Sequence, residues 1–217
     1  MVYQTFSDQK GTSNSLNKLY KIKFPYVKGK RVLDIGCNEG FFCIEAKKRG
    51  AIKVVGIDKN PKLIEKAKKR APDIDFRTQD WDNLPNEEFD VILLLSTLHY
   101  SKTKQKLIDD IYKILSPEGI FILECGGVPG PGKDIEMIRK NGSMVYHPTW
   151  KFLTKDLLKN FKQKDIGISV KKDGEGVERR IFHCKKLNSI EDYDLPNEIR
   201  PNNSFRNILK NYLPFFK

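Results

Sequence analysis

The stretch VLDIGCNEG (residues 32–40) places a carboxylate and two glycines where a strand should pass into a helix. Asp34 comes two residues before Gly36, and Gly40 closes the stretch. Glycines at such a turn allow a ligand to approach the backbone closely, because they adopt positive φ angles and carry no side chain. A carboxylate beside them favours a ligand group with positive charge. The spacing therefore predicts a binding turn for a cationic part of a ligand.

The same stretch differs from a dinucleotide-binding turn. That turn carries glycines at the first, third and sixth positions of GxGxxG and seats a pyrophosphate on a helix N-terminus. Here these positions hold Gly36, Asn38 and Phe41, and Asp34 would repel the phosphates. The pattern thus disfavours an oxidoreductase that uses NAD. S-adenosylmethionine meets the requirement, because it has an ammonium, a sulfonium, a ribose diol and an adenine but no phosphate.

The elements that must position this turn alternate between strands and helices. Apolar runs predict five strands, and helical periodicity with proline and glycine boundaries predicts three helices. The strands cover residues 31–35, 52–58, 74–80, 89–96 and 119–125, and the helices 39–49, 61–70 and 102–115. This alternation predicts an α/β fold with a doubly wound, mostly parallel sheet in three α/β/α layers. Ligands bind such sheets beyond the carboxyl ends of the strands.

After residue 125 the alternation stops. The glycines and prolines of CGGVPGPGK open an insertion over residues 125–150, which we expect to be an irregular binding loop or lid. A helix over residues 154–161, capped by Thr154, should follow. Two strands near residues 165–171 and 178–186 flank the hairpin signal DGEG. This C-terminal hairpin would complete a seven-stranded sheet with an antiparallel edge.

VLDIGCNEG resembles the glycine-rich first motif, D-x-G-x-G-x-G, of the class I S-adenosylmethionine-dependent methyltransferases. The resemblance implies S-adenosylmethionine as cofactor and S-adenosylhomocysteine as product. It also implies a methyltransferase domain over residues 29–186, an extension or lid over residues 1–28 and a tail over residues 187–217. The residues that it places around the cofactor are Asp34, Gly36 and Gly40 at the methionine part, Asp58 at the ribose hydroxyls, Asp80 and Trp81 at the adenine, and Ser96 through its backbone.

Asn38 is the departure from that motif, because it replaces the central glycine. Asparagine tolerates left-handed backbone better than most residues, so the turn can form. Its amide could also contact the cofactor directly. The other assignments have structural alternatives as well: Asp58 could cap the helix that begins at Pro61, and Asp80 could simply form a turn.

Two residues are candidates for catalysis. His99 follows the fourth predicted strand in STLHY, and an imidazole can act as a base near neutral pH; it could instead cap the next helix. Glu124 ends the fifth strand and could accept a proton or bind a cationic substrate, with an ion pair at the sheet edge as the alternative. His183 lies within the terminal hairpin, and we expect it to be structural.

The substrate candidates come from the insertion and the hairpin. Tyr146, His147 and Trp150 could line a pocket or pack the loop onto the core, and the cationic residues Lys133, Arg139 and Arg179 would suit an anionic group such as a phosphate or carboxylate. Clustered carboxylates and imidazoles would be needed for a divalent ion. Glu124, His99 and His147 could meet only if the insertion folds back over the sheet, so we predict no metal.

The net charge of +12 invites a nucleic-acid partner, with residues 18–31 as the densest basic stretch. Lysines are spread over every helix and outnumber arginines, which favours a solvated surface instead. The four cysteines form no CxxC pair, so we expect buried thiols. No apolar run is long enough for a membrane helix, and the first 25 residues lack the apolar core of a signal peptide, so we expect a cytoplasmic protein.

Three functions follow as hypotheses. The first is an enzyme that methylates an O or N atom of a small, anionic metabolite or a glycan unit, because an enclosed pocket suits such a substrate. The lysine-rich sequence also resembles methyltransferases of bacterial capsule and surface-polysaccharide modification. The second is an RNA methyltransferase anchored by the basic stretch. The third is a non-catalytic module that binds a partner through the aromatic tail NYLPFFK.

Overall fold

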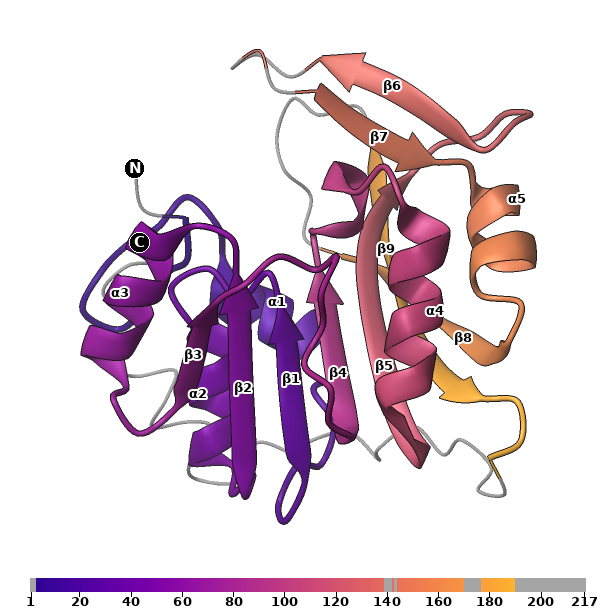
Figure 1. Ribbon diagram of the computed structural model, residues 1–217. Helices are drawn as coiled ribbons and strands as arrows, with labels where there is room; N and C mark the ends of the chain where they lie inside the picture. Colours follow the sequence, from indigo (N-terminus) through magenta and orange to yellow (C-terminus); the bar gives the residue numbers. More distant parts are fainter. Residues whose placement is uncertain (1–2, 139–141, 143, 170–176, 190–217) are drawn as a thin grey trace.

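The computed structural model describes residues 3–138, 142, 144–169 and 177–189. Its main sheet has seven strands in the order β3-β2-β1-β4-β5-β9-β8 (Figure 1). The first five strands pair in parallel, and β9 and β8 pair antiparallel at one edge. The bounds of these strands are β1 Arg31–Ile35, β2 Lys53–Asp58, β3 Asp75–Thr78, β4 Phe89–Leu95, β5 Leu115–Gly127, β8 Phe161–Ile168 and β9 Glu178–Lys186. The predicted fold class is therefore confirmed.

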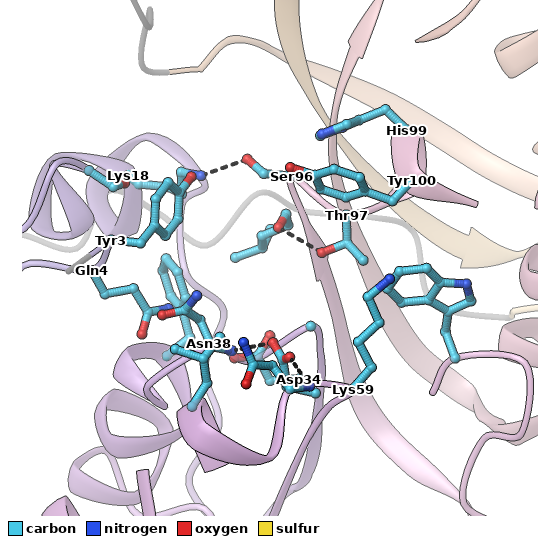
Figure 2. A pocket seen from close by; sticks show the side chains of 18 of the residues that line it. Tyr3, Gln4, Lys18, Asp34, Asn38, Lys59, Ser96, Thr97, His99 and Tyr100 are labelled. Carbon is cyan, nitrogen blue, oxygen red and sulfur yellow. Dashed lines mark hydrogen bonds between the residues drawn. The ribbon is translucent and has the colours of Figure 1, made fainter. Parts of the chain in front are cut away.

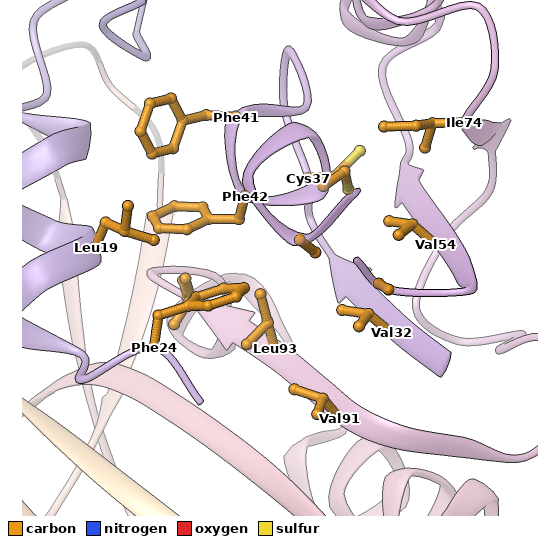
Figure 3. Close-up of a cluster of buried hydrophobic side chains, with 14 of the residues drawn as sticks. Leu19, Phe24, Val32, Cys37, Phe41, Phe42, Val54, Ile74, Val91 and Leu93 are labelled. Carbon is orange, nitrogen blue, oxygen red and sulfur yellow. The ribbon is translucent and has the colours of Figure 1, made fainter. Parts of the chain in front are cut away.

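Helices cover both faces of this sheet, because its central strands are apolar on both sides. In β4, Val91 and Leu93 point into one buried cluster, whereas Ile92 and Leu94 point into the other. The first cluster, part of which Figure 3 shows, joins the sheet to the helices α1 Ser15–Lys21, α2 Phe41–Lys48 and α3 Pro61–Arg70. The second joins it to α4 Lys104–Ile114 and to the π-helical turn η2 Leu153–Leu157. The result is three layers.

The N-terminal segment is part of the core, whereas the sequence pattern placed it outside. Phe6, Leu19, Ile22 and Phe24 are all buried in the first cluster. Ser15, Lys18, Leu19 and Ile22 follow helical spacing on one face of α1, and that face packs inward. This helix was missed because its buried face contains a lysine and a serine among the apolar residues.

The insertion contains regular structure, which corrects the expectation of an irregular loop. Strand β5 continues through Gly126 and Gly127, and β6 Asp134–Ile138 pairs antiparallel with β7 Met144–Pro148 as a separate two-stranded sheet. Figure 1 shows this sheet at the top of the view, beyond the carboxyl ends of β4 and β5. Backbone pairing across the hairpin supplies the order that the glycine-rich and proline-rich start of the insertion does not predict.

The helix expected over residues 154–161 begins and ends four residues earlier in the sequence, at Trp150 and Leu157. The short helix α5 Trp150–Phe152 begins after Thr149, whose hydroxyl accepts a hydrogen bond from the Phe152 N–H at 3.2 Å, and η2 continues it. Thr154 is not the cap, because its hydroxyl donates back to the Trp150 carbonyl at 2.9 Å. Phe161 already belongs to β8, where it pairs with Lys186. The turn DGEG lies outside the described residues.

Strand β1 lies between β2 and β4 in the sheet. The chain places β2 and β3 on one side of β1 and then crosses to place β4 and β5 on its other side, so the strand order reverses between β1 and β4. This reversal of strand order opens a crevice at the carboxyl ends, where open α/β sheets bind ligands. Asp34, Asp58 and Ser96 lie at or next to those ends, and Glu124 in β5 pairs with Leu95, the last residue of β4. Among the described residues, no helix is long and apolar enough to cross a membrane.

Candidate active site

A cavity of about 770 Å³ opens at the strand-order reversal (Figure 2). This volume lies within the range of small-molecule sites, roughly 300–1,000 Å³. Nine of the predicted site residues line it, and eight of these are Asp34, Gly36, Asn38, Asp58, Trp81, Ser96, His99 and Arg179. Tyr146, from β7, lines it as well. The described structure thus brings most of the predicted cofactor residues and part of the predicted acceptor residues to one cavity.

The turn after β1 is built from three left-handed residues. Gly36, Asn38 and Gly40 have φ angles of 76°, 55° and 85°. A Cβ atom at Gly36 would lie 2.5 Å from the Thr97 hydroxyl oxygen, so a larger residue there would disturb the packing of the cavity wall. Asn38 is the non-glycine residue that this backbone tolerates best, and its side-chain oxygen accepts the Glu39 N–H at 2.9 Å.

Asp34 presents a buried carboxylate beneath that turn. The residue is only 2% exposed, and the Cys43 thiol donates to its Oδ2 at 3.6 Å. Burial raises the pKa of Asp34 to about 7, and the nearby Asp58 carboxylate adds to this rise, whereas the Cys43 hydrogen bond and the Lys18 charge oppose it. A cationic ligand group would favour the ionised carboxylate. Asp34 is therefore suited to bind an ammonium.

Asp58 holds the turn from the neighbouring strand. Its Oδ2 accepts the Asn38 N–H at 3.0 Å and its Oδ1 the Asn60 N–H at 2.9 Å, and each oxygen keeps a further lone pair for a ligand. Asn60, not Asp58, caps α3. Trp81 lines the same side of the cavity, with the Lys59 ammonium 5.0 Å from its ring centre.

Asp80 and Gly40 do not reach the cavity lining. Asp80 is exposed and absent from the residues around the cavity, so its predicted contact with an adenine has no support in the geometry. Strand β3 ends at Thr78, two residues before Asp80. Gly40 acts through the backbone, as the residue before α2, where a Cβ atom would lie 2.6 Å from the Phe76 ring.

Glu124 lies behind the cavity wall and forms the ion pair that was the alternative to its catalytic role. Its Oε2 accepts the Lys18 ammonium at 3.2 Å and the Ser96 hydroxyl, and its Oε1 accepts the Ser169 hydroxyl at 2.7 Å. Burial acts to raise the pKa of Glu124, but Lys18, Ser96 and Arg179 outweigh it and the pKa is lowered. An ionised, fully hydrogen-bonded carboxylate is a poor proton acceptor.

The histidines of η1 Leu98–Tyr100 and β7 meet above the cavity. The rings of His99 and His147 stack with centres 5.1 Å apart and an angle of 21° between their planes. His99 lines the cavity, whereas His147 lies behind it, with Nδ1 3.2 Å from the Gly126 carbonyl oxygen. The insertion therefore does fold back over the sheet. The described residues nevertheless contain no group of three His, Cys, Asp or Glu placed to hold a metal ion.

Two other predicted substrate residues fall elsewhere. Trp150 packs its ring against Gly127 and Phe182 at the core, which was the alternative reading of this residue. Lys133 lies near the Phe152 ring and not in the cavity lining. Arg139 lies outside the described residues. His183 is structural as expected: its Nε2 lies 2.7 Å from the Ile22 carbonyl oxygen, and burial lowers its pKa to about 4.

The N-terminal segment supplies site residues that the sequence reading missed. Tyr3, Gln4 and Lys18 all line the cavity. The Gln4 amide braces the turn after β1, because its Nε2 donates to the Cys37 carbonyl at 3.2 Å and its Oε1 accepts the Phe41 N–H at 3.1 Å. Lys18 opens the basic stretch that suggested a nucleic-acid surface, yet it points inward. Its helical spacing with Leu19 and Ile22 is the signal that could have identified it.

Comparison with known proteins shows the family of the chain. Residues 27–166 match the family model described as a methyltransferase domain. A tRNA U34 carboxymethyltransferase of Hahella chejuensis is 33% identical over 113 residues, which is 48% of this chain and 34% of that protein. A ubiquinone biosynthesis O-methyltransferase of Coxiella burnetii is 30% identical over 121 residues, 50% of this chain and 51% of that protein. The chain thus matches a third to a half of the length of these curated relatives.

Among solved structures, a putative S-adenosylmethionine-dependent methyltransferase from Listeria monocytogenes superposes with a TM-score of 0.65 and 20% identity. The match covers 80% of this chain and all of that one, 100%. A similar enzyme from Mesorhizobium loti gives a TM-score of 0.62 and 21% identity, over 77% of this chain and 96% of that one. The chain belongs to the methyltransferase domain family.

Proposed function

We propose that this protein transfers a methyl group from S-adenosylmethionine to an O or N atom of a small metabolite or glycan unit inside the cavity. The observation that carries this proposal is the division of the cavity into two halves. One half holds the carboxylates of Asp34 and Asp58 and the left-handed turn, and the other is lined by His99 and Tyr146. The N-terminal segment lines the cavity with Tyr3, Gln4 and Lys18. The N-terminal segment thereby acts as the proposed lid.

The residues of the first half fit the cofactor. Asp34 would hold the ammonium, Asp58 the ribose hydroxyls and Trp81 one face of the adenine, while the backbone of the Gly36 turn approaches the methionine part. The bound cofactor supplies an electrophilic methyl group, which bonds to the acceptor atom as the carbon–sulfur bond breaks and a neutral thioether leaves. The chain itself must orient the acceptor, exclude water and remove the acceptor proton.

In this proposal, His99 removes the proton from the acceptor atom. It lines the cavity beside Ser96 and Thr97, where β4 ends, and the ring of His147 fixes its plane by stacking. A hydrogen bond of His147 with the Gly126 carbonyl in turn holds that second ring. Glu124 is a positioning residue, because its contacts hold Lys18 and Ser96 at the cavity wall.

An acceptor the size of a metabolite fits this closed geometry better than an RNA duplex does. Phosphorylated and nucleotide-linked sugars, the units of surface polysaccharides, are our first candidates. The alternative acceptor is RNA, because the Hahella relative is named a tRNA U34 carboxymethyltransferase. RNA binding through the surface lysines would weaken steeply as salt rises, because phosphate contacts release counterions. Cytoplasmic location stays a prediction.

Calorimetric titration with S-adenosylhomocysteine tests the cofactor half first, and a mass-spectrometric screen for methylated products tests the acceptor half. The screen should contain phosphorylated metabolites, nucleotide-linked sugars and bulk transfer RNA. We expect binding of S-adenosylhomocysteine and methylation of a small acceptor at a rate that changes little with salt. Methylation of transfer RNA alone would establish the RNA alternative, and binding without any methylation would favour the non-catalytic module.

A further inference from the structure

Two cationic side chains meet at one point of the cavity wall. Lys18 comes from α1 and Arg179 from the start of β9, and both residues are buried, at 5% and 7% exposure. The Lys18 ammonium donates to the Ser96 hydroxyl oxygen at 2.9 Å, and the Arg179 guanidinium donates to the same oxygen at 2.8 Å. The two charges therefore lie within about 6 Å of each other, since each is at hydrogen-bond distance from one atom.

A scaffold behind the wall holds this pair in place. Ser96 has a φ angle of 57°, a strained conformation that the surrounding structure must support. The Ser96 hydroxyl donates its proton to Glu124, so both of its lone pairs are available to the two cations. Glu124 also anchors Lys18 directly and is itself fixed by Ser169. Four separate elements of the chain thus converge to place two positive charges in a cavity.

Lys18 retains a hydrogen-bond donor for a ligand. An ammonium has three N–H groups, and Ser96 and Glu124 take two of them. Because Lys18 lines the cavity, a ligand bound there can approach its ammonium. The pKa of the nearby Tyr3 phenol reflects the charges of Lys18 and Arg179. Burial acts to raise the pKa of Tyr3, and yet that pKa is lowered, with Lys18 and Arg179 opposing both burial and Glu124.

The pair lies on the acceptor side of the cavity. Asp58 ends β2, whereas Arg179 begins β9, four strands further along the sheet. Both cations nevertheless reach Ser96, which follows β4, two strands from β2. At about 4.8 Å per strand, the pair is therefore roughly 10 Å along the sheet from Asp58. Ser96 comes three residues before His99, the proposed base. We propose that Lys18 and Arg179 form an oxyanion subsite that binds the phosphate or carboxylate group of the methyl acceptor. This assignment rests on the proposed function of the cavity.

Inorganic phosphate is the probe that tests the subsite. Its binding should be measured by phosphorus NMR line broadening and by calorimetry, in the ligand-free protein and with saturating S-adenosylhomocysteine. We expect saturable binding to the wild-type protein in both states. Lys18→Met and Arg179→Gln should weaken it at least tenfold, and Arg179→Lys, which keeps the charge, should weaken it less. Lys62→Met removes one charge from the exposed face of α3, outside the cavity, and should leave binding within twofold.

Two results would overturn the subsite. The first is no saturable phosphate binding, or equal loss in Lys18→Met and Lys62→Met. The second is competition between phosphate and S-adenosylhomocysteine with a tenfold loss of S-adenosylhomocysteine affinity in Lys18→Met, because the pair would then hold the cofactor's own carboxylate. Failure of S-adenosylhomocysteine to bind at all contradicts the proposed function instead, and phosphate binding to the ligand-free protein still decides on the subsite. Circular dichroism confirms that each variant is folded.

Discussion

Lys18 and Glu124 form a buried ion pair, with Nζ and Oε2 3.2 Å apart, although the two residues are 106 positions apart in the chain. Glu124 has no exposed surface, at 0%. The pair joins helix α1 to the end of β5 and thereby fastens the N-terminal segment over the cavity. Because a charge left alone in such a place is costly, this contact has measurable consequences for stability.

Glu124→Gln should lower the free energy of unfolding by about 3 kcal/mol, the lower end of what breaking a buried ion pair costs. Urea denaturation followed by circular dichroism measures the change. Glu65→Gln is the matched control, since it breaks a solvent-exposed pair with Lys69 and should change stability little. Similar unfolding curves for the two variants would mean that Lys18 finds another partner without cost.

Asp58→Ala should weaken S-adenosylhomocysteine binding by about 1–3 kcal/mol, the cost of leaving buried polar groups unpaired. Besides its proposed contact with the ribose, the carboxylate accepts hydrogen bonds from the backbone N–H groups of Asn38 and Asn60. Calorimetry measures the affinity. Asp80→Ala is the control, because Asp80 is exposed and away from the cavity lining. Equal affinity in Asp58→Ala and the wild-type protein would reject the ribose contact.

The affinity for S-adenosylhomocysteine should rise with pH up to about 7 and then level off. Burial raises the pKa of Asp34 to about 7, so the carboxyl group is protonated below that pH and must release its proton before it can pair with an ammonium. Each pH unit below 7 should therefore cost up to about tenfold in affinity.

Calorimetry between pH 5.5 and 7.5 measures this dependence, with Asp34→Asn as the comparison. The amide does not titrate, so the variant should bind weakly and with a flat profile over that range. A wild-type profile that is equally flat would show that the ammonium pairs elsewhere.

Asn38→Gly should keep both stability and S-adenosylhomocysteine affinity close to wild type, because glycine adopts the φ angle of 55° without strain. Asn38→Val should cost about 1–2 kcal/mol of stability, the price of a left-handed conformation for other residues. Urea denaturation and calorimetry together test both variants. A tenfold loss of affinity in Asn38→Gly would instead indicate that the amide contacts the cofactor.

His99→Asn should lower the single-turnover rate of methyl transfer by roughly 10²-fold or more, the usual contribution of a general base. Its affinity for S-adenosylhomocysteine should stay nearly unchanged, because Asp34, Asp58 and Trp81 are the side chains proposed to hold the cofactor. Rapid-quench measurement with the acceptor found in the screen gives the rate. His147→Asn tests the stacking partner and should have a smaller effect. An unchanged rate in His99→Asn would assign proton removal to another group or to solvent.

The sequence by itself determined the α/β alternation, the binding turn and the ends of the first strands. These features depend on local properties: apolar runs and helical periodicity set the elements, Pro61 starts α3 where expected, and a left-handed turn needs glycine or asparagine. The prediction of S-adenosylmethionine as cofactor came from the same stretch, because Asp34 and the turn residues are close in the chain.

Only the tertiary structure decided which polar residues meet. In the folded chain, Lys18 points into the cavity and Glu124 accepts hydrogen bonds from three side chains. The ring of His147 stacks on that of His99, and Asp80 lies outside the cavity lining. The physical reason is that each of these outcomes depends on packing between segments far apart in the chain. A lysine or glutamate has the same secondary-structure propensity whether its side chain lies at the surface or in a buried ion pair. Its contacts with residues far away in the chain therefore decide whether its charge lies in the cavity.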